Sequence, residues 1–293
     1  MRLDQTQLVI RERSLLELLD LALRLFSANG LPLLLSAGPL ILVCMIGSEV
    51  LIGWMLTDLD DPGQVTRYLW TQFLLISINA PLVTAPMITY LGQAVFQERP
   101  DVWQVLRSTL QAWWPLLVYV VFGRGIAFAW GLVLLIPRYG EYSTAEGWLV
   151  LLAGVCMLIR AARPFICEII LLERNPMRAR DKQTMTVRRR STALHGPHTG
   201  DLIGRWILTA ILTVSLVLAL IATLWCVQGT LLFNWNLGDW FLRLAIPAIM
   251  WFVVVFMHVV RFLTYLDTRI RREGWEVELK VRAAAARWEG QFV

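Results

Sequence analysis

Charged residues are scarce in this sequence. Lysine, arginine, aspartate and glutamate make up 17% of its 293 residues, whereas hydrophobic residues make up 57%. A soluble domain of this length needs more polar residues than this to cover its core, so the composition excludes an ordinary soluble fold. Most of the chain must therefore face lipid, and we expect one membrane domain.

Motifs for catalysis and cofactor binding are also missing. The sequence contains no Walker loop, HExxH helix, GxSxG elbow or dinucleotide fingerprint. Its four cysteines lie inside apolar stretches without a CxxC pair, which argues against a disulfide framework or a metal cage. We therefore predict no enzyme activity, no catalytic residue, no cofactor and no metal site.

The three histidines do not change this prediction. His195 and His198 are three residues apart, but Pro197 between them breaks the helix that metal binding at this spacing would need. They are interpreted as ordinary loop histidines. His258 lies near the end of an apolar stretch and is predicted to be a hydrogen-bonded histidine at a helix interface rather than a proton carrier.

What the sequence does contain is a series of long apolar stretches. A bilayer core about 30 Å thick is crossed by roughly 20 apolar residues in a helix. Six stretches meet this requirement, at 31–56, 68–92, 113–137, 148–172, 206–227 and 242–263. The predicted fold class is all-α, a polytopic membrane helix bundle of about six spans. It comprises an interfacial segment 1–30, a membrane domain 31–265 and a tail 266–293.

Amphipathic segments adjoin these spans. Residues 15–26 place leucines on one helical face and charged residues on the other, which predicts a helix lying on the membrane and ending at Asn29-Gly30. A second short amphipathic helix is expected at 101–112. The tail alternates like a strand at 275–281, but helical spacing also fits, and we favour an amphipathic helix at the cytoplasmic surface.

The distribution of basic residues predicts the orientation. The N-terminal segment, the 93–112 and 173–205 connections and the tail are basic, whereas the other three connections carry only Arg67, Arg138 and Arg243. Because basic connections are retained in the cytoplasm, both termini are predicted to be cytoplasmic, in a bacterial cytoplasmic (inner) membrane. The net charge of +5 is thus attributed to topology and to contact with anionic lipid, not to nucleic acid.

Five charged residues inside the spans form the candidate site: Arg124, Arg160, Arg163, Glu49 and Glu168. A charge near a helix centre costs roughly 2.5–3.5 kcal/mol on insertion, so such residues face the bundle interior, a wet cavity or an anionic partner. Arg124 and Arg160 fall at similar depth and are expected to face one region, with Glu49 or a lipid phosphate as counter-ion. The alternative is a structural ion-pair network, and Arg163 and Glu168 could instead reach the cytoplasmic interface.

Prolines predict helix breaks and an internal repeat. Pro164 directly after Arg163 predicts local unwinding of the fourth span, and Asn79-Ala80-Pro81 predicts a similar break in the second. Pro81, Pro164 and Pro247 stand at equal intervals of 83 residues, which favours three helical-hairpin repeats. Because Pro247 lies earlier in its span than the other two, coincidence is the alternative.

Three segments resemble those of a known family. They are Arg13-Ser-Leu-Leu-Glu-Leu-Leu-Asp-Leu-Ala-Leu-Arg-Leu-Phe, Pro164-Phe-Ile-Cys-Glu-Ile-Ile-Leu-Leu-Glu-Arg-Asn-Pro and Phe262-Leu-Thr-Tyr-Leu-Asp-Thr-Arg-Ile-Arg-Arg-Glu-Gly-Trp. With them the chain resembles the glycerophosphoryl diester phosphodiesterase membrane-domain family over most of its length, and planctomycete multi-pass membrane proteins with the same ending. The phosphodiesterase domain that names the family does not occur in this sequence, and the family's serine-and-arginine run is altered at 184–195. The resemblance therefore implies a membrane module without catalysis.

Two functions are consistent with these features. The first is a non-enzymatic scaffold or envelope component that binds anionic membrane lipid, or a protein partner through the 173–205 connection or the tail. The alternative is a transporter or lipid-translocating protein in which Arg124, Arg160 and Arg163 form an anion or headgroup site. A third, weaker interpretation is an intramembrane enzyme of lipid metabolism, which would lack the usual carboxylate or histidine cluster.

Overall fold

The described part of the chain is entirely helical. The computed structural model describes residues 15–57, 61–95, 100–137, 143–178, 185–196 and 199–273. Their helices are α1 Leu15–Ile52, η2 Gly53–Leu56, α2 Pro62–Val83, α3 Ala85–Ala94, α4 Val102–Gln111, α5 Trp113–Leu116, η3 Leu117–Phe122, α6 Ile126–Leu134, α7 Thr144–Ala162, α8 Ile166–Leu171, α9 Val187–His195, α10 Thr199–Leu231, η5 Phe241–Ala245 and α11 Ile246–Glu273. No strand occurs among them, which agrees with the predicted all-α class.

Several of these helices are suited to a membrane. Four are long and apolar enough to cross one, and the number rises to six if each of two bent helix pairs is one span. The bent pairs are α2 with α3 and α4 with Trp113–Phe122. The composition and the helices together therefore identify a polytopic membrane bundle of four to six candidate spans.

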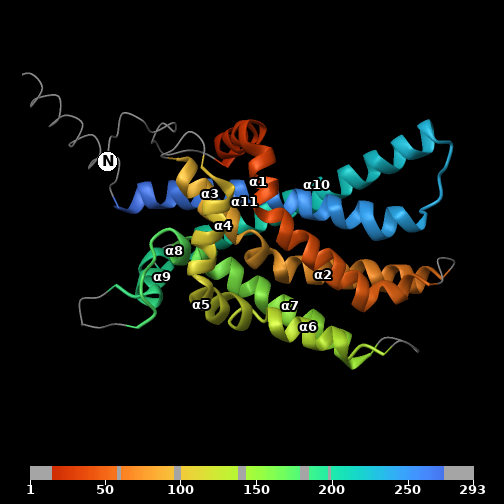
Figure 1. The fold of residues 1–293 in the computed structure, drawn as a ribbon, viewed down its shortest axis with the longest axis horizontal. Helices are drawn as coiled ribbons and strands as arrows, with labels where there is room; N and C mark the ends of the chain where they lie inside the picture. The colour runs from red at the N-terminus through yellow and green to blue at the C-terminus, as the bar shows by residue number, and fades with distance from the viewer. Residues whose placement is uncertain are drawn as a thin grey trace, which may run out of the picture.

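Three antiparallel hairpins organise the bundle. The end of α1 and the start of α2, the end of α6 and the start of α7, and the junction of α10 with α11 lie together at the right-hand end of Figure 1. The helices α8 and α9 and the end of α11 lie at the opposite end (Figure 1). The molecule thus has two distinct ends, and the three weakly basic connections predicted from the sequence share one of them.

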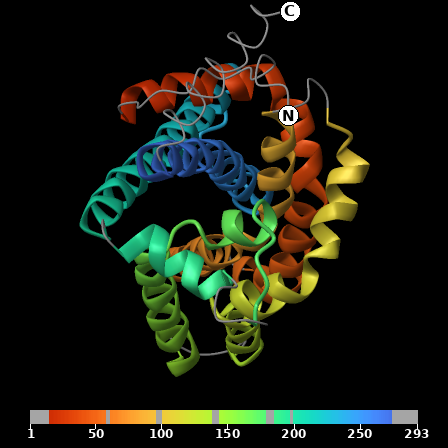
Figure 2. The same ribbon diagram turned by 90° about the vertical axis from the view of Figure 1, so that its left-hand side faces the viewer.

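The first helix is kinked where the sequence predicts an end. Asn29 has non-helical backbone angles (φ −124°, ψ 18°) inside α1. Pro32 follows three residues later and has no N–H to continue the helical hydrogen bonds, which accounts for a break in this turn. As Figure 2 shows, the part of α1 before the kink crosses the end of the bundle, and the part after it runs along the other helices.

Two further helices are interrupted near the centre of the molecule. As predicted, α7 ends just before Pro164: Arg163 has φ −135° and ψ 68°, and α8 starts at Ile166. The break predicted at Asn79-Ala80-Pro81 lies slightly later, because α2 stays helical to Val83 and bends by 41° at Thr84. Pro86 at the start of α3 explains the shift, since proline disfavours helix in the turn that precedes it.

The stretch predicted as the third span, 113–137, is not one helix. It consists of α5, the π-helical η3 and α6, separated at Gly123-Arg124-Gly125. Gly125 adopts a left-handed conformation (φ +69°), and a Cβ there would lie 2.7 Å from Leu152 Cδ1 on α7. The left-handed backbone favours glycine, and a Cβ would in addition displace the end of the Leu152 side chain. The preceding amphipathic helix is present as predicted, as α4, capped by Asp101.

The helices differ strongly in burial. In α11, 61% of the most apolar window is buried, whereas in α10 none of it is. One face of α10 is therefore exposed along most of its length, while residues such as Val217, Ile221 and Leu224 on the other face are partly buried against the core. This is the expected arrangement for a helix at the edge of a bundle in lipid.

Some predictions concern residues that the structure does not describe. The first half of the N-terminal segment (1–14), the amphipathic tail after Glu273, His198 and Arg138 all lie outside the described residues. The predictions for them stay as they were.

Candidate functional site

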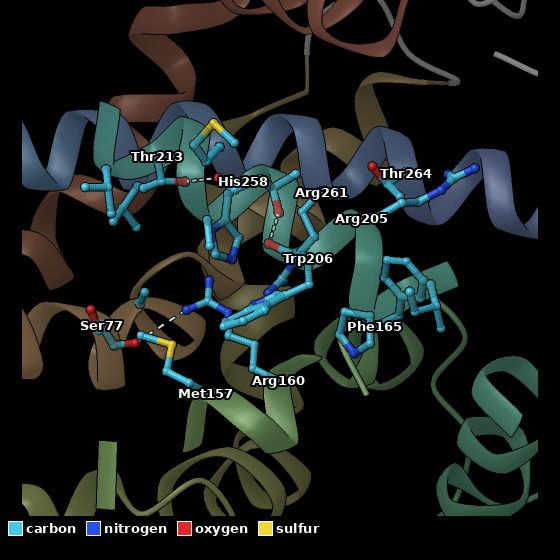
Figure 3. Close-up of a pocket in the computed structure, with 18 of the residues that line it drawn as sticks. Ser77, Met157, Arg160, Phe165, Arg205, Trp206, Thr213, His258, Arg261 and Thr264 are labelled. Atoms are coloured by element: carbon cyan, nitrogen blue, oxygen red, sulfur yellow. Dashed lines mark hydrogen bonds between the residues drawn. The ribbon is translucent and has the colours of Figure 1, made fainter. Parts of the chain in front are cut away.

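A cavity of about 180 Å³ lies between α2, α7, α10 and α11. Phe73, Met157, Val254 and Met257 give it apolar walls, and the helix break at Pro164 and Phe165 adjoins it. The polar groups on its lining are unusual for a space among candidate spans, because three of them are arginines. Its polar lining comprises Ser77, Arg160, Arg205, Thr209, Thr213, His258, Arg261 and Thr264 (Figure 3).

Arg160 reaches into this cavity from α7. Its Nη1 donates to the backbone carbonyl of Ser77 on α2 at 3.4 Å. In an uninterrupted helix this carbonyl would accept a hydrogen bond from the N–H of residue 81. Residue 81 is a proline, which has no N–H, so the carbonyl can accept from Arg160 instead. Proline in α2 thus creates an acceptor for the guanidinium, and the arginine has no carboxylate partner among the described residues.

Arg124 lies next to Arg160. Both side chains line a second, much smaller cavity beside Ser77 and Pro81, so the two arginines do face one region, as their similar depth predicted. Arg124 is 2% exposed, its Nη2 donates to the Arg163 carbonyl at 3.2 Å, and its Nε and Nη1 have no partner among the described residues. The break after α7 therefore supplies a carbonyl that holds this arginine.

Two carboxylates neutralise the other two arginines. Glu168 on α8 is fully buried and accepts from Arg261 Nε at 3.0 Å, with Nη2 at 2.8 Å. Asp267 accepts from Arg205 at 3.3 Å. Among the described residues, four guanidinium groups and two paired carboxylates thus lie in and beside the cavity, and two of the four guanidinium groups have no carboxylate partner there.

His258 is the remaining ionisable group on the lining. It is 2% exposed, and its Nε2 has no partner among the described residues. In Figure 3, His258 and Arg261 extend from α11 toward Arg160. The expectation of a fully hydrogen-bonded interface histidine is therefore wrong for one of its two nitrogens.

Two of the sequence-predicted residues do not belong to the cavity. Glu49 was expected as a counter-ion for Arg124 and Arg160, but it pairs with Arg243 and accepts from Tyr68 at 3.3 Å. Arg243 lies in η5, next to the junction of α10 with α11, whereas the residues of these two helices that line the cavity lie farther from that junction, within 202–214 and 254–264. Arg163 is exposed and only its carbonyl takes part in the site.

Glu168 does reach the site, but not as a residue that extends to the cytoplasmic interface. It is enclosed, with Arg261 as its partner. Arg205, His258 and Arg261 were not among the predicted site residues, since His258 and Arg261 lie at the end of the predicted sixth span and Arg205 at the end of the 173–205 connection. One signal was present: His258 and Arg261 are three residues apart and so share a helical face.

The connection after α8 folds back on the helix break. His195 is buried on α9, and its Nε2 accepts the backbone N–H of Phe165 at 3.2 Å. Phe165 lines the cavity and stacks on the His195 ring with centroids 5.5 Å apart. His195 is therefore a structural histidine that satisfies an N–H freed by the break, and the described residues contain no group of three metal-ligating side chains.

Glu173 fastens the same connection to α11. It accepts from Arg190 Nε at 2.6 Å and Nη2 at 2.9 Å, and from the Tyr265 hydroxyl at 2.9 Å. Burial by itself raises the pKa of this carboxyl, but the hydrogen bonds from Arg190 and Tyr265 and the nearby charges outweigh it and hold the pKa below its ordinary value. Glu173 is thus ionised at neutral pH and its contacts persist.

This arrangement is chemically an anion site. Guanidinium groups bind phosphate and carboxylate oxygens through paired N–H donors, and two of the four here lack a counter-ion among the described residues. Comparison of the chain with models of known protein families, with characterised proteins and with solved structures found no match. The family resemblance therefore stays a prediction, and function has to be argued from the cavity.

Proposed function

We propose that this chain is a non-enzymatic membrane module that binds the anionic headgroup of a lipid in the cavity between α2, α7, α10 and α11. The observation that carries the proposal is Arg160, an arginine without a carboxylate partner among the described residues that faces an apolar-walled cavity. A cation among membrane-spanning helices is costly unless an anion or polar groups stabilise it. A lipid phosphate is the anion most abundant at the edge of a bilayer.

The proposed topology gives such a phosphate access. We infer six spans, with α2 and α3 as the second and α5, η3 and α6 as the third, and with both termini in the cytoplasm of a bacterial cell. The cavity adjoins the break after α7, next to the basic connection 173–205, so it opens on the cytoplasmic half of the membrane. There the basic residues attract anionic lipid, each contributing about 1 kcal/mol. Tags at either terminus should be reached from the cytoplasmic side only.

The two ends of the bundle support this orientation. At the end assigned to the outer face, Arg67 and Arg243 are each held by a carboxylate, Glu146 and Glu49 respectively. The positive-inside rule counts lysine and arginine in short connections, and the three connections at this end carry only Arg67, Arg138 and Arg243. We further propose that the three hairpins are copies of one unit, a proposal supported by the equal spacing of Pro81, Pro164 and Pro247.

The test compares two arginines three residues apart. Wild-type protein, Arg160→Gln and Arg163→Gln would be purified from native membranes, and co-purified phospholipid would be counted per protein by mass spectrometry. We expect wild type and Arg163→Gln, which alters an exposed side chain, to retain an anionic phospholipid. Arg160→Gln should retain much less anionic phospholipid, because losing a charged hydrogen bond worth about 1.5–3 kcal/mol weakens binding about tenfold or more. Equal lipid retention in all three proteins would refute the proposal.

A second function is favoured by one observation, the pair of interrupted helices beside the cavity. The bend at Thr84 and the break at Arg163 lie in neighbouring helices, and interrupted helices often form the binding sites of transporters. A lipid-translocating protein would use the same cavity. Wild-type protein in vesicles should then move labelled anionic lipid between leaflets, and Arg160→Gln should not. Lipid that binds but is not moved between leaflets would favour the scaffold or envelope role, in which the 173–205 connection or the tail contacts a protein.

A further inference from the structure

Large apolar side chains are exposed on α4 and at the start of α5. Trp103 is 76% exposed, Leu110 69%, Trp113 56% and Trp114 54%. None of them lines the cavity described above. Grouped apolar side chains of this kind mark a surface that contacts lipid or another molecule.

The direction of α4 sets it apart from the candidate spans. The helix is bent by 67° from the segment that follows it, Trp113–Phe122, with which we infer that the third span begins. Figure 2 looks along the long axis of Figure 1, and in it α4 (yellow) runs across the view at the edge of the molecule. A helix that crosses the direction of the spans lies close to the plane of the membrane.

The side chains of α4 divide into three sectors around the helix axis. At about 3.6 residues per turn, Trp103 and Leu110, which are seven positions apart, share one sector. Val105 and Thr109 are buried in a second sector, where the Thr109 hydroxyl is hydrogen-bonded to the Thr89 hydroxyl on α3 at 3.0 Å. The third sector carries the exposed polar residues Gln104, Arg107 and Gln111.

These sectors match the three surroundings of a helix that lies in the membrane surface beside a bundle. The buried sector packs on protein, the apolar sector would face lipid, and the polar sector would face water. If the free side of α4 met water alone, both remaining sectors would be polar. Arg107 borders the apolar sector, and an arginine there can reach a lipid phosphate while its aliphatic part stays among apolar groups.

The residues after the bend favour lipid over a protein partner. Trp113 and Trp114 lie at the start of α5 and pack edge to face, with ring centroids 5.3 Å apart. They extend the apolar sector of α4 to the inferred third span, so the two surfaces are continuous. Tryptophan is also the residue typical of the boundary between lipid and water.

We propose that α4 is a membrane-surface helix, with Trp103 and Leu110 inserted into the lipid and the polar sector in water. This surface goes beyond the proposed function, because it is separate from the cavity and requires no headgroup bound there. It would hold the start of the third span at the level of the lipid headgroups.

Spin labels on the full chain in lipid vesicles test the proposal. Cys44 and Cys226 would be replaced by alanine, because they are half-buried and exposed, whereas Cys156 and Cys167 are buried and stay. Into this background go Trp103→Cys and Leu110→Cys from the apolar sector, with Gln104→Cys and Gln111→Cys as matched controls. The background itself, which should take up no label, controls for the buried cysteines.

Collisions with two reagents show the surroundings of each label, since oxygen concentrates in lipid and a charged nickel chelate in water. Labels at 103 and 110 should meet oxygen more often than the chelate and lie about 5–10 Å into the boundary between headgroups and acyl chains. Labels at 104 and 111 should show the reverse. All four positions are exposed, so the packing of α4 on α3 should survive each substitution.

Three results would overturn the proposal. Labels at 103 and 110 that meet the chelate as often as the controls would put the apolar sector in water. Little contact with either reagent at 103 and 110 would mean that protein covers them, either a second copy of the chain or another partner. Lipid around all four labels would exclude a surface orientation. None of these results bears on the headgroup site, because α4 does not line the cavity.

Discussion

The ion pair between Glu168 and Arg261 gives the sharpest test of the packing described above. The side chain of Glu168 is 0% exposed and that of Arg261 is 12% exposed, and two guanidinium nitrogens lie within 3.0 Å of one carboxylate oxygen. Replacing Glu168 by glutamine keeps the shape of the side chain but removes the charge. Arg261 then stays buried without its counter-ion, and breaking a buried pair in this way costs about 3–5 kcal/mol.

A second ion pair in the same chain is the matched control. Glu49 and Arg243 are also paired, but their side chains are 36% and 30% exposed. Exposed pairs contribute about 0–1 kcal/mol, so Glu49→Gln should cost no more than that. Both substitutions remove one carboxylate from one arginine. Glu49→Gln leaves Arg243 paired with Asp239 at 2.6 Å, whereas Glu168→Gln leaves Arg261 without a carboxylate among the described residues. The difference between their effects therefore measures the cost of a buried guanidinium that has lost its counter-ion.

The assay is unfolding of the purified protein in mixed micelles by titration with SDS, followed by circular dichroism. We expect the midpoint for Glu168→Gln to fall far below that of wild type and the midpoint for Glu49→Gln to move little. Replacing both partners, as Glu168→Leu with Arg261→Met, should recover most of the lost stability, because no charge is then left unpaired. Equal losses in the two glutamine variants, or a double variant less stable than the single one, would refute the reasoning.

Three further predictions concern the helix break, the tight turn and the folded connection. Pro81→Ala supplies an N–H to the carbonyl that Arg160 now binds, so it should raise the free energy of unfolding in SDS by about 1 kcal/mol or more; a loss would contradict this. Gly125→Ala should lower the free energy of unfolding by about 1–3 kcal/mol, because a Cβ strains the left-handed backbone and displaces a side chain of α7. Gly154→Ala places its Cβ in open space and should change this free energy by less than about 1 kcal/mol. Equal effects of the two substitutions would contradict this reasoning. The folded-state pKa of Glu173 is lower than the unfolded value, so its contribution is complete at neutral pH and is lost as the pH falls through the folded pKa. Proteolysis within 185–196 should accelerate in that acidic range, and Glu173→Gln should remove the pH dependence; a Gln variant with the wild-type pH profile would contradict this.

Much of the architecture follows from local sequence signals. Apolar length predicted the helices, and proline chemistry predicted the break at Pro164, since both depend on residues close together in the chain. The kink at Asn29 and the amphipathic helix α4 follow in the same way. The third predicted span is divided at Gly125, whose left-handed backbone no apolar pattern reveals.

The composition of the site could be predicted only in part. The prediction that Arg124 and Arg160 face one region relied on their similar depth in the membrane. Depth can be counted along each predicted span without knowing which spans are neighbours. The choice of counter-ions depends on which helices are neighbours, and the sequence does not state this. Glu49 was therefore assigned to the wrong arginine, while Arg261 and His258 were overlooked. The role of Pro81 in exposing a carbonyl to Arg160 likewise requires α2 and α7 to be adjacent.

The central claim is that an anionic headgroup occupies the cavity between α2, α7, α10 and α11. The most direct measurement is a cryo-EM map of the full chain extracted into native-lipid nanodiscs, inspected beside Arg160. We expect density for a phosphate within hydrogen-bonding distance of Arg160 and Arg261, continuous with acyl chains that pass along α10. A cavity closed by side chains, or filled by acyl chain alone, would contradict the claim.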